Sequence, residues 1–115
     1  TKPYGYSIFQ LDNMVLLCQV LSTNEDNLWL YTLPDGRGIR KAVAFLYPFL
    51  ADKSKWTLKP DIQAWEGWPA RQPSLLLAGR QFGEATYLDL WKKLPADPTD
   101  PEVQRNIGVT QPVLW

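Results

Sequence analysis

Tyr4 and Tyr6 flank Gly5 close to Lys2, near the amino end of the chain. A cation beside a tyrosine stabilises the phenolate, so either ring could exchange a proton with a substrate in a cleft from which water is excluded. The ordinary alternative is an aromatic anchor whose hydroxyl is hydrogen-bonded. Spacing alone favours the anchor, and it leaves the proton-transfer role open for both tyrosines.

A basic cluster follows a turn sequence in the first half of the chain. Arg37, Arg40 and Lys41 could bind the carboxylates of an acidic polymer, arginine through a bidentate fork. The alternative that we favour is a solvated surface whose cations pair with Asp35 or Asp52. The sequence therefore leaves a polymer contact open for this cluster and favours a solvated, charged surface.

Trp65 and Trp68 could form a platform for sugar rings, because pyranose C–H faces pack well on indole. They could also fill the gap between two helices, and we favour this second interpretation. Arg71 and Gln72 follow at an expected helix start. Their side chains are predicted to fix the preceding connection through hydrogen bonds to its backbone carbonyls.

Composition excludes several classes of function. Histidine is absent, which removes the usual general base at neutral pH and the commonest metal ligand. Cys18 is the only cysteine, so an internal disulfide and a thiolate metal cluster are excluded, and its apolar helical stripe predicts an inert core residue. Twelve basic residues balance twelve acidic ones, and no apolar stretch is long enough to span a bilayer. We therefore expect no metal, no cofactor, no nucleic acid and no membrane partner.

Helical spacing of apolar residues predicts four main helices and one short one. The main helices are expected at residues 6–21, 38–52, 69–82 and 84–94. Pro48 falls inside the second of these and should bend it. Thr99 as the cap, Pro101 in the first turn and Glu102 at the capping-box position predict the short fifth helix. That helix should end between Asn106 and Gly108.

The connections between these helices are long. Residues 1–5 are predicted to be an extended lead-in, residues 24–38 a turn-rich loop, and residues 53–68 an ordered connection that packs its indoles on neighbours. Residues 111–115 end on an apolar residue and are expected to pack against the body. Helix pairs joined by long loops predict an all-α fold, and they fit part of a toroid or solenoid better than a bundle with tight turns.

Five strings, taken together and in order, resemble the later part of alginate-lyase-domain proteins, the helical polysaccharide lyases. The strings are KPYGYS at residues 2–7, PDGRGIRKA at 34–42, ADKSKW at 51–56, WPARQPSL at 68–75 and YLDLWK at 87–92. This resemblance covers nearly the whole chain. It implies part of an (α/α) toroid, an incomplete barrel of helix pairs with long loops, of which residues 1–115 would be the carboxy-terminal fragment.

The resemblance also implies a reaction and a set of site residues. Such enzymes cleave a uronate polymer by β-elimination: Asn, His and Arg neutralise the uronate carboxylate, the C5 proton is removed, and a tyrosine exchanges a proton with the reacting centre or the leaving oxygen. Tyr6 matches the family tyrosine, and Tyr4 is the fallback. The candidate substrate-binding residues are Lys2, Trp65, Trp68 and Arg71.

The chain departs from the family pattern because it has no histidine, and the family's Asn/His pair and nearby arginine belong to segments that would precede Thr1. We therefore expect the chain alone to be inactive, with the missing amino-terminal part of the same protein as its partner and an acidic polysaccharide as substrate. A periplasmic or secreted location is implied, although this chain shows no signal peptide. The alternatives are a non-catalytic sugar-binding module and a helical interaction domain.

Overall fold

The computed structural model describes residues 1–108, and these residues form α-helices and two short 3₁₀ turns. The elements in order are α1 (Pro3–Leu21), α2 (Ile39–Ala51), η1 (Lys53–Lys55), η2 (Trp65–Gly67), α3 (Pro73–Phe82), α4 (Ala85–Lys93) and α5 (Pro101–Asn106). Among the described residues the only β pairing is an isolated bridge between Thr32 and Gly38. The all-α prediction is therefore confirmed, while residues 111–115, expected to pack on the body, lie outside the described part.

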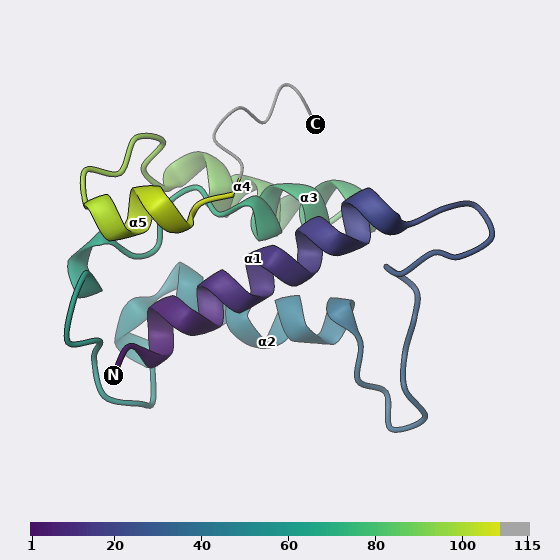
Figure 1. Cartoon of the computed structure of the whole chain (residues 1–115), viewed down its shortest axis with the longest axis horizontal. Helices are drawn as coiled ribbons and strands as arrows, with labels where there is room; N and C mark the ends of the chain where they lie inside the picture. Colours follow the sequence, from purple (N-terminus) through teal and green to yellow (C-terminus); the bar gives the residue numbers. More distant parts are fainter. Residues whose placement is uncertain (109–115) are drawn as a thin grey trace.

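The long helix α1 lies between α2 on one side and the α3–α4 pair on the other (Figure 1). Its buried face meets the inner faces of α2 and α3 in one apolar core. Core residues from these three helices are Tyr4, Ile8, Leu11, Val15, Val43, Leu46, Leu75 and Ala78. Unlike a typical surface helix, α1 also carries apolar side chains on its outer face, where Met14, Leu17 and Val20 are exposed.

Helix α1 begins at Pro3, so the prediction of an extended lead-in through Gly5 is wrong. The first backbone N–H groups of a helix have no partner within it and need one from elsewhere. Here the buried carboxylate of Asp61 supplies both bonds, accepting from the N–H of Tyr4 and the N–H of Gly5 at 2.8 Å each. Because this cap comes from the distant 53–68 connection, the local sequence carries no sign of it.

Gly5 is required by the close approach of that connection to the helix. A Cβ atom at this position would lie 2.8 Å from Trp68 Nε1 and 2.9 Å from Asp61 Oδ2. Both neighbours are buried, so neither can move away easily. The glycine between the two tyrosines therefore serves packing.

The second predicted helix is confirmed to within one residue at each end. It runs as α2 from Ile39 to Ala51, with Pro48 inside it. The helix continues past the proline for one turn, because the carbonyl of Pro48 still accepts a hydrogen bond from the N–H of Asp52 at 2.9 Å. Val43, Leu46 and Leu50 form its buried face, as the apolar spacing indicated.

Helix α3 begins at Pro73 instead of the predicted Pro69. The residue before a proline is disfavoured from helical conformation, and Gln72 is indeed extended, with ψ 131°. The side-chain oxygen of Gln72 accepts a bond from the N–H of Ala70 at 2.8 Å, which stabilises this extended segment. Helix propensity in residues 69–72 is thus overridden by the proline that follows them.

A buried carboxylate on α1 also caps α3. Asp12 accepts bonds from Nε2 of Gln72 at 2.7 Å and from the N–H of Ser74 at 3.1 Å. Burial raises the pKa of Asp12 to about 6, and the bonds from Ser74 and Gln72 act in the opposite direction. This polar contact fixes the register of α1 against α3 inside an otherwise apolar interface.

Helices α3 and α4 form a tight antiparallel pair, and α4 (Ala85–Lys93) agrees closely with the predicted 84–94. Gly83 ends α3 in the left-handed region with φ +64°, as expected for a glycine at a helix end. A Cβ on Gly79 would lie 2.9 Å from the side chain of Leu88. The two helices can therefore approach closely only because residue 79 has no side chain.

The short helix α5 is present, but its cap is Asp100 and not Thr99. Pro101 occupies the first helical position, so the preceding residue takes the cap, and Asp100 Oδ1 accepts from the N–H of Glu102 at 2.9 Å. The Glu102 side chain is consequently not used for capping. It contacts Lys2 instead.

Candidate active site

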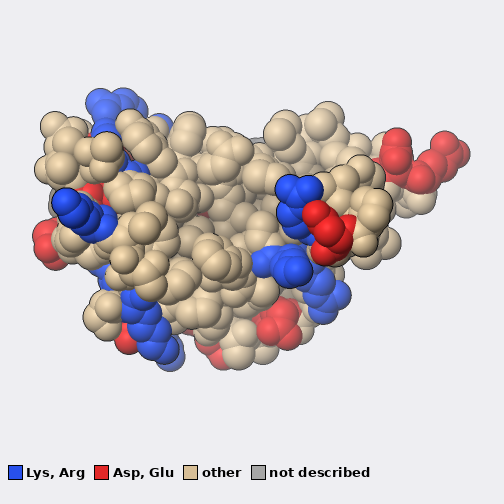
Figure 2. Space-filling view, turned by 90° about the horizontal axis from the view of Figure 1, so that it is seen from below, with Lys and Arg blue, Asp and Glu red and all other residues tan. Residues whose placement is uncertain are grey.

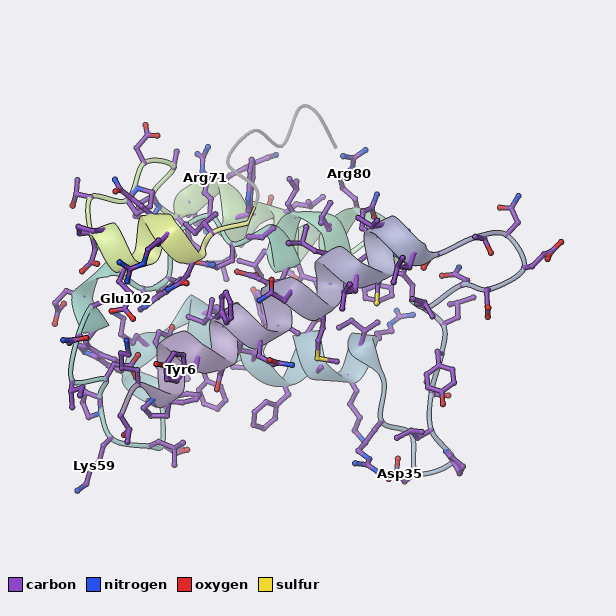
Figure 3. All side chains as sticks on the ribbon, in the orientation of Figure 1. Tyr6, Asp35, Lys59, Arg71, Arg80 and Glu102 are labelled. Atoms are coloured by element: carbon purple, nitrogen blue, oxygen red, sulfur yellow. The ribbon has the colours of Figure 1, made fainter. Side chains whose placement is uncertain are left out.

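Tyr6 lies on the first turns of α1 with its ring 58% exposed. It lines an open groove of about 510 Å³ between α1 and α2, together with Ser7, Gln10 and Phe45. Figure 3 shows Tyr6 at the amino-terminal end of α1, at the same end of the molecule as Glu102. The predicted catalytic tyrosine therefore stands at the surface of a groove, where a polymer can reach it.

Lys2 is placed beside this ring. Its Nζ lies 5.2 Å from the centroid of the Tyr6 ring and forms an ion pair with Glu102 of α5. The side chains of Lys2 and Glu102 are only 19% and 15% exposed, so this pair is better sheltered than an ordinary surface pair. The hydrogen bond to Glu102 raises the pKa of Lys2 above its ordinary value. Lys2 therefore remains an ammonium ion next to Tyr6 at neutral pH.

Tyr4, the fallback, is an anchor in the core. Its ring is fully buried and its hydroxyl donates a hydrogen bond to the carbonyl of Phe49 at 2.8 Å. Trp56 and Trp65 pack against the ring with centroids 5.1 and 5.2 Å away. Burial raises the pKa of Tyr4 well above its usual range. A buried, bonded and hard-to-ionise phenol is unsuited to proton exchange with a polymer.

The two tryptophans of the 53–68 connection serve packing. Trp68 is 3% exposed and lies against Gly5, so the prediction that its face receives a sugar ring is contradicted by its burial. Trp65 is half-buried, packs on Tyr4, and has the Lys53 ammonium 4.8 Å from its ring centroid. This arrangement fits the alternative interpretation, in which the indoles fill the gap beside α1.

Arg71 is also occupied within the fold. Its guanidinium donates to the carbonyl of Leu94 at 3.1 Å and to that of Lys92 at 2.9 Å, and it lies 4.8 Å from the centre of the Trp91 ring. These carbonyls are unsatisfied groups at the carboxy end of α4, where a cation is favourable. Arg71 does bind backbone carbonyls as predicted, but those at the end of α4 and not those of its own connection, and this use occupies the Nε and Nη2 donors on one side of its guanidinium.

The basic cluster near the start of α2 is divided between different partners. Arg37 pairs with Asp35 at 2.7 Å on the exposed loop, which confirms the favoured interpretation for this residue. Arg40 lies over the ring of Phe82 at 4.9 Å. Lys41 is exposed at the same margin. Figure 2 shows charged side chains gathered at the edges of one face, around a hollowed area in which uncharged residues predominate.

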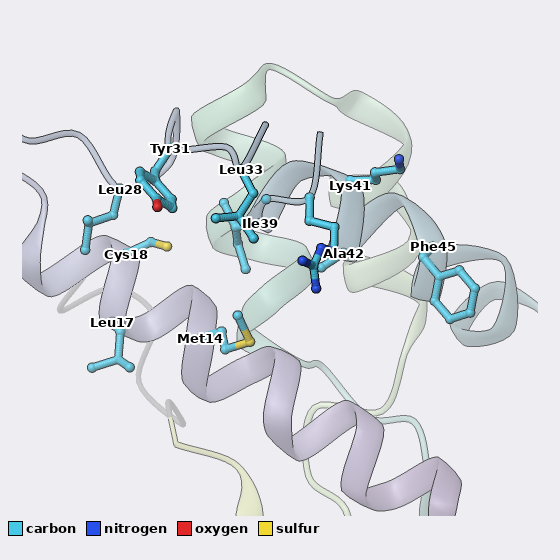
Figure 4. Close-up of a pocket in the computed structure, with 12 residues that line it drawn as sticks. Met14, Leu17, Cys18, Leu28, Tyr31, Leu33, Ile39, Lys41, Ala42 and Phe45 are labelled. Carbon is cyan, nitrogen blue, oxygen red and sulfur yellow. The ribbon is translucent and has the colours of Figure 1, made fainter. Parts of the chain in front are cut away.

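A second groove, of about 660 Å³, adjoins the one at Tyr6 (Figure 4). The two grooves share Met14, Ala42 and Phe45. The second groove is lined mostly by apolar side chains, among them Leu17 and Leu33, and also by Arg37 and Lys41. An apolar lining on this scale suits another apolar surface better than a charged sugar polymer.

Three carboxylates shape the site without any local sequence signal. Asp61 caps α1, Asp12 caps α3, and Glu102 holds Lys2. All three act on residues more than fifty positions away, so no local pattern marks them. Among residues 1–108, no group of three or more His, Cys, Asp or Glu is arranged to hold a metal ion, and no helix has the length and apolar character that a membrane span requires.

Comparison with protein families gives one match. The family model described as alginate lyase matches residues 1–56, just under half of the chain. The resemblance to alginate-lyase-domain proteins is thereby confirmed over the segment that contains α1, α2 and Tyr6. Comparisons with curated proteins and with solved structures give no significant match.

Proposed function

We propose that this chain is part of a polysaccharide lyase that cleaves an alginate-like uronate polymer by β-elimination, with Tyr6 as the residue that exchanges a proton. The observation that carries the proposal is the exposed Tyr6 ring, which lines a groove beside the Lys2 ammonium within the segment that matches the alginate lyase family. The other tyrosine near this end of the chain, Tyr4, is unsuited to proton exchange, because it is buried and hydrogen-bonded.

The chemistry requires a proton to leave C5 of the uronate. The C5–H electron pair becomes the C4–C5 double bond, the C4–O4 bond breaks, and the departing O4 takes up a proton. Tyr6 can accept the first proton as a phenolate or donate the second as a phenol. The nearby Lys2 ammonium attracts an acidic polymer to this ring. The developing negative charge on the carboxylate needs further donors, for which no histidine is available in this chain.

The wider setting belongs to the same proposal. The chain would be the carboxy-terminal part of an (α/α) toroid in a periplasmic or secreted enzyme, and the remaining catalytic groups would come from another part of the protein. An all-helical fold in which α1 carries apolar side chains on its exposed face as well as its buried face supports this, because such a helix is normally covered by neighbours.

A direct assay of the full-length protein tests the proposal. We expect incubation with polymannuronate or polyguluronate to release unsaturated uronates, detected by the rise in ultraviolet absorbance of the C4–C5 double bond. A neutral glucan of similar length should give no such rise, because it has no C5 carboxylate to acidify the C5 proton. Failure with every polyuronate tried would refute the lyase assignment.

A second candidate, a helical interaction domain, is favoured by one observation. The apolar groove between α1 and α2 leaves Leu17 56% and Phe45 69% exposed. Exposed apolar surface of this size is costly in water and normally meets a partner. In the lyase interpretation this groove packs against another helical segment of the same protein.

This exposure predicts that the 115-residue chain associates in solution. Sedimentation velocity over a range of concentrations should show self-association, and the double variant Leu17→Lys/Phe45→Lys should shift the chain to monomers. Leu58 and Ile62 are similarly exposed but do not line the groove, so Leu58→Lys/Ile62→Lys is the matched control and should leave association unchanged. A monomeric parent chain at all concentrations, or equal effects of both double variants, would show that the groove is not an interface.

A further inference from the structure

A contact between the two ends of the described chain reaches the candidate site. The Lys2 ammonium, beside the Tyr6 ring, is held by Glu102 on α5, one hundred residues further along the chain. The family match ends at residue 56, so Glu102 lies outside the segment whose resemblance identifies Tyr6. The site at Tyr6 is therefore built from both parts of the chain.

Helix α5 is held firmly enough to position a side chain. Val103, next to Glu102, is fully buried. Gly67 lies against it so closely that a Cβ there would be 2.8 Å from Val103 and 3.0 Å from Asp100. Because α5 is packed on η2 in this way, the backbone of Glu102 is held in place, and its carboxylate can hold Lys2 in a defined position.

Lys2 needs such a restraint. A lysine side chain has four rotatable bonds and loses much of its rotamer freedom when it is fixed. Without a partner its ammonium would spend much of its time in solvent, away from Tyr6. An ion pair whose two side chains are only 19% and 15% exposed keeps the ammonium at the 5.2 Å seen here.

We infer that Glu102 is a positioning residue for the reaction: by holding Lys2 beside the Tyr6 ring, it fixes a positive charge next to the group that exchanges the proton, where charge that develops on an acidic substrate is stabilised. This inference rests on the proposed function, since it assigns Glu102 a part in the same elimination. It also means that α5, outside the family match, contributes to turnover without touching the substrate.

The test is Glu102→Gln in the full-length protein, assayed by the release of unsaturated uronate. We expect kcat to fall about tenfold with KM nearly unchanged, because a misplaced group near the reacting centre costs transition-state stabilisation. Glu102→Asp, which keeps the charge, should recover part of the loss.

The control breaks an ion pair that is exposed and joins near neighbours in the sequence. Asp35→Asn removes the charge that pairs with Arg37 on the exposed loop, and it should leave kcat unchanged. If Glu102→Gln lowers only the melting temperature and leaves kcat in place, or if Glu102→Asp recovers none of a lost kcat, the contact is structural and the inference is overturned. If the unaltered protein is active and Tyr6→Phe is inactive while Glu102→Gln is normal, the inference alone fails. An unaltered protein inactive on every polyuronate overturns both proposals.

Discussion

Replacing Tyr6 by phenylalanine in the full-length protein should lower the rate of unsaturated uronate release at least a hundredfold. Proton transfer by a positioned side chain contributes about 10²–10⁴-fold to a rate, and the substitution removes only the oxygen that performs it. The ring is 58% exposed, so folding should be unaffected. The measurement is kcat by ultraviolet absorbance, with the melting temperature recorded alongside.

Two further tyrosines provide the controls for this result. Tyr31 is exposed and lies away from the groove at Tyr6, so Tyr31→Phe should retain full activity. Tyr4→Phe removes the hydrogen bond to the Phe49 carbonyl and should cost about 1 kcal/mol of stability while activity remains. Normal turnover in Tyr6→Phe together with an inactive but folded Tyr4→Phe would transfer the catalytic role to Tyr4.

Replacing Asp61 by alanine should destabilise the chain by about 3 kcal/mol. The substitution removes the acceptor of two buried bonds, from the N–H groups of Tyr4 and Gly5, and leaves both donors without a partner. That loss is a large fraction of the stability of a small domain. It should appear as a lower midpoint in urea denaturation, followed by tryptophan fluorescence.

The effect should also extend to the site. Tyr6 lies in the first turns of α1, and its N–H bonds to the carbonyl of Lys2 at 3.0 Å, so fraying of this helix end would displace both Tyr6 and Lys2. Asp97→Ala, at an exposed aspartate that forms no hydrogen bond among the described residues, is the control and should change stability by less than about 0.5 kcal/mol. Equal midpoints for the Asp61 and Asp97 variants would show that the capping bonds contribute nothing.

The sequence predicted the helices well because apolar periodicity reports burial directly. Helices α2 and α4 agree with expectation to within one residue at each end. The starts of α1 and α3 were misplaced for different reasons. The first is capped by Asp61 from a distant connection, and the second is delayed because Gln72 precedes a proline.

The candidate site was predictable only in part. The family-like string around Tyr6 pointed to the tyrosine, and the structure places that residue at a groove. Trp68 and Arg71 have residue types that suit sugar binding, but both are used within the fold, one in the core and one at the end of α4. Residue type does not distinguish these uses, because only the tertiary contacts determine which faces remain free. The link between Lys2 and Glu102 spans the chain and has no local signature.

The long-range contacts of Asp61 and Glu102 determine where this polypeptide can be truncated. A gene fragment that stops at residue 56 would encode α1 and α2 but would lack Asp61 and Glu102. The N–H groups of Tyr4 and Gly5 would then lose their acceptor, and Lys2 would lose its ion pair. The end of the family match at residue 56 is therefore not the end of a folding unit. The position of Tyr6 depends on residues that the family match does not cover.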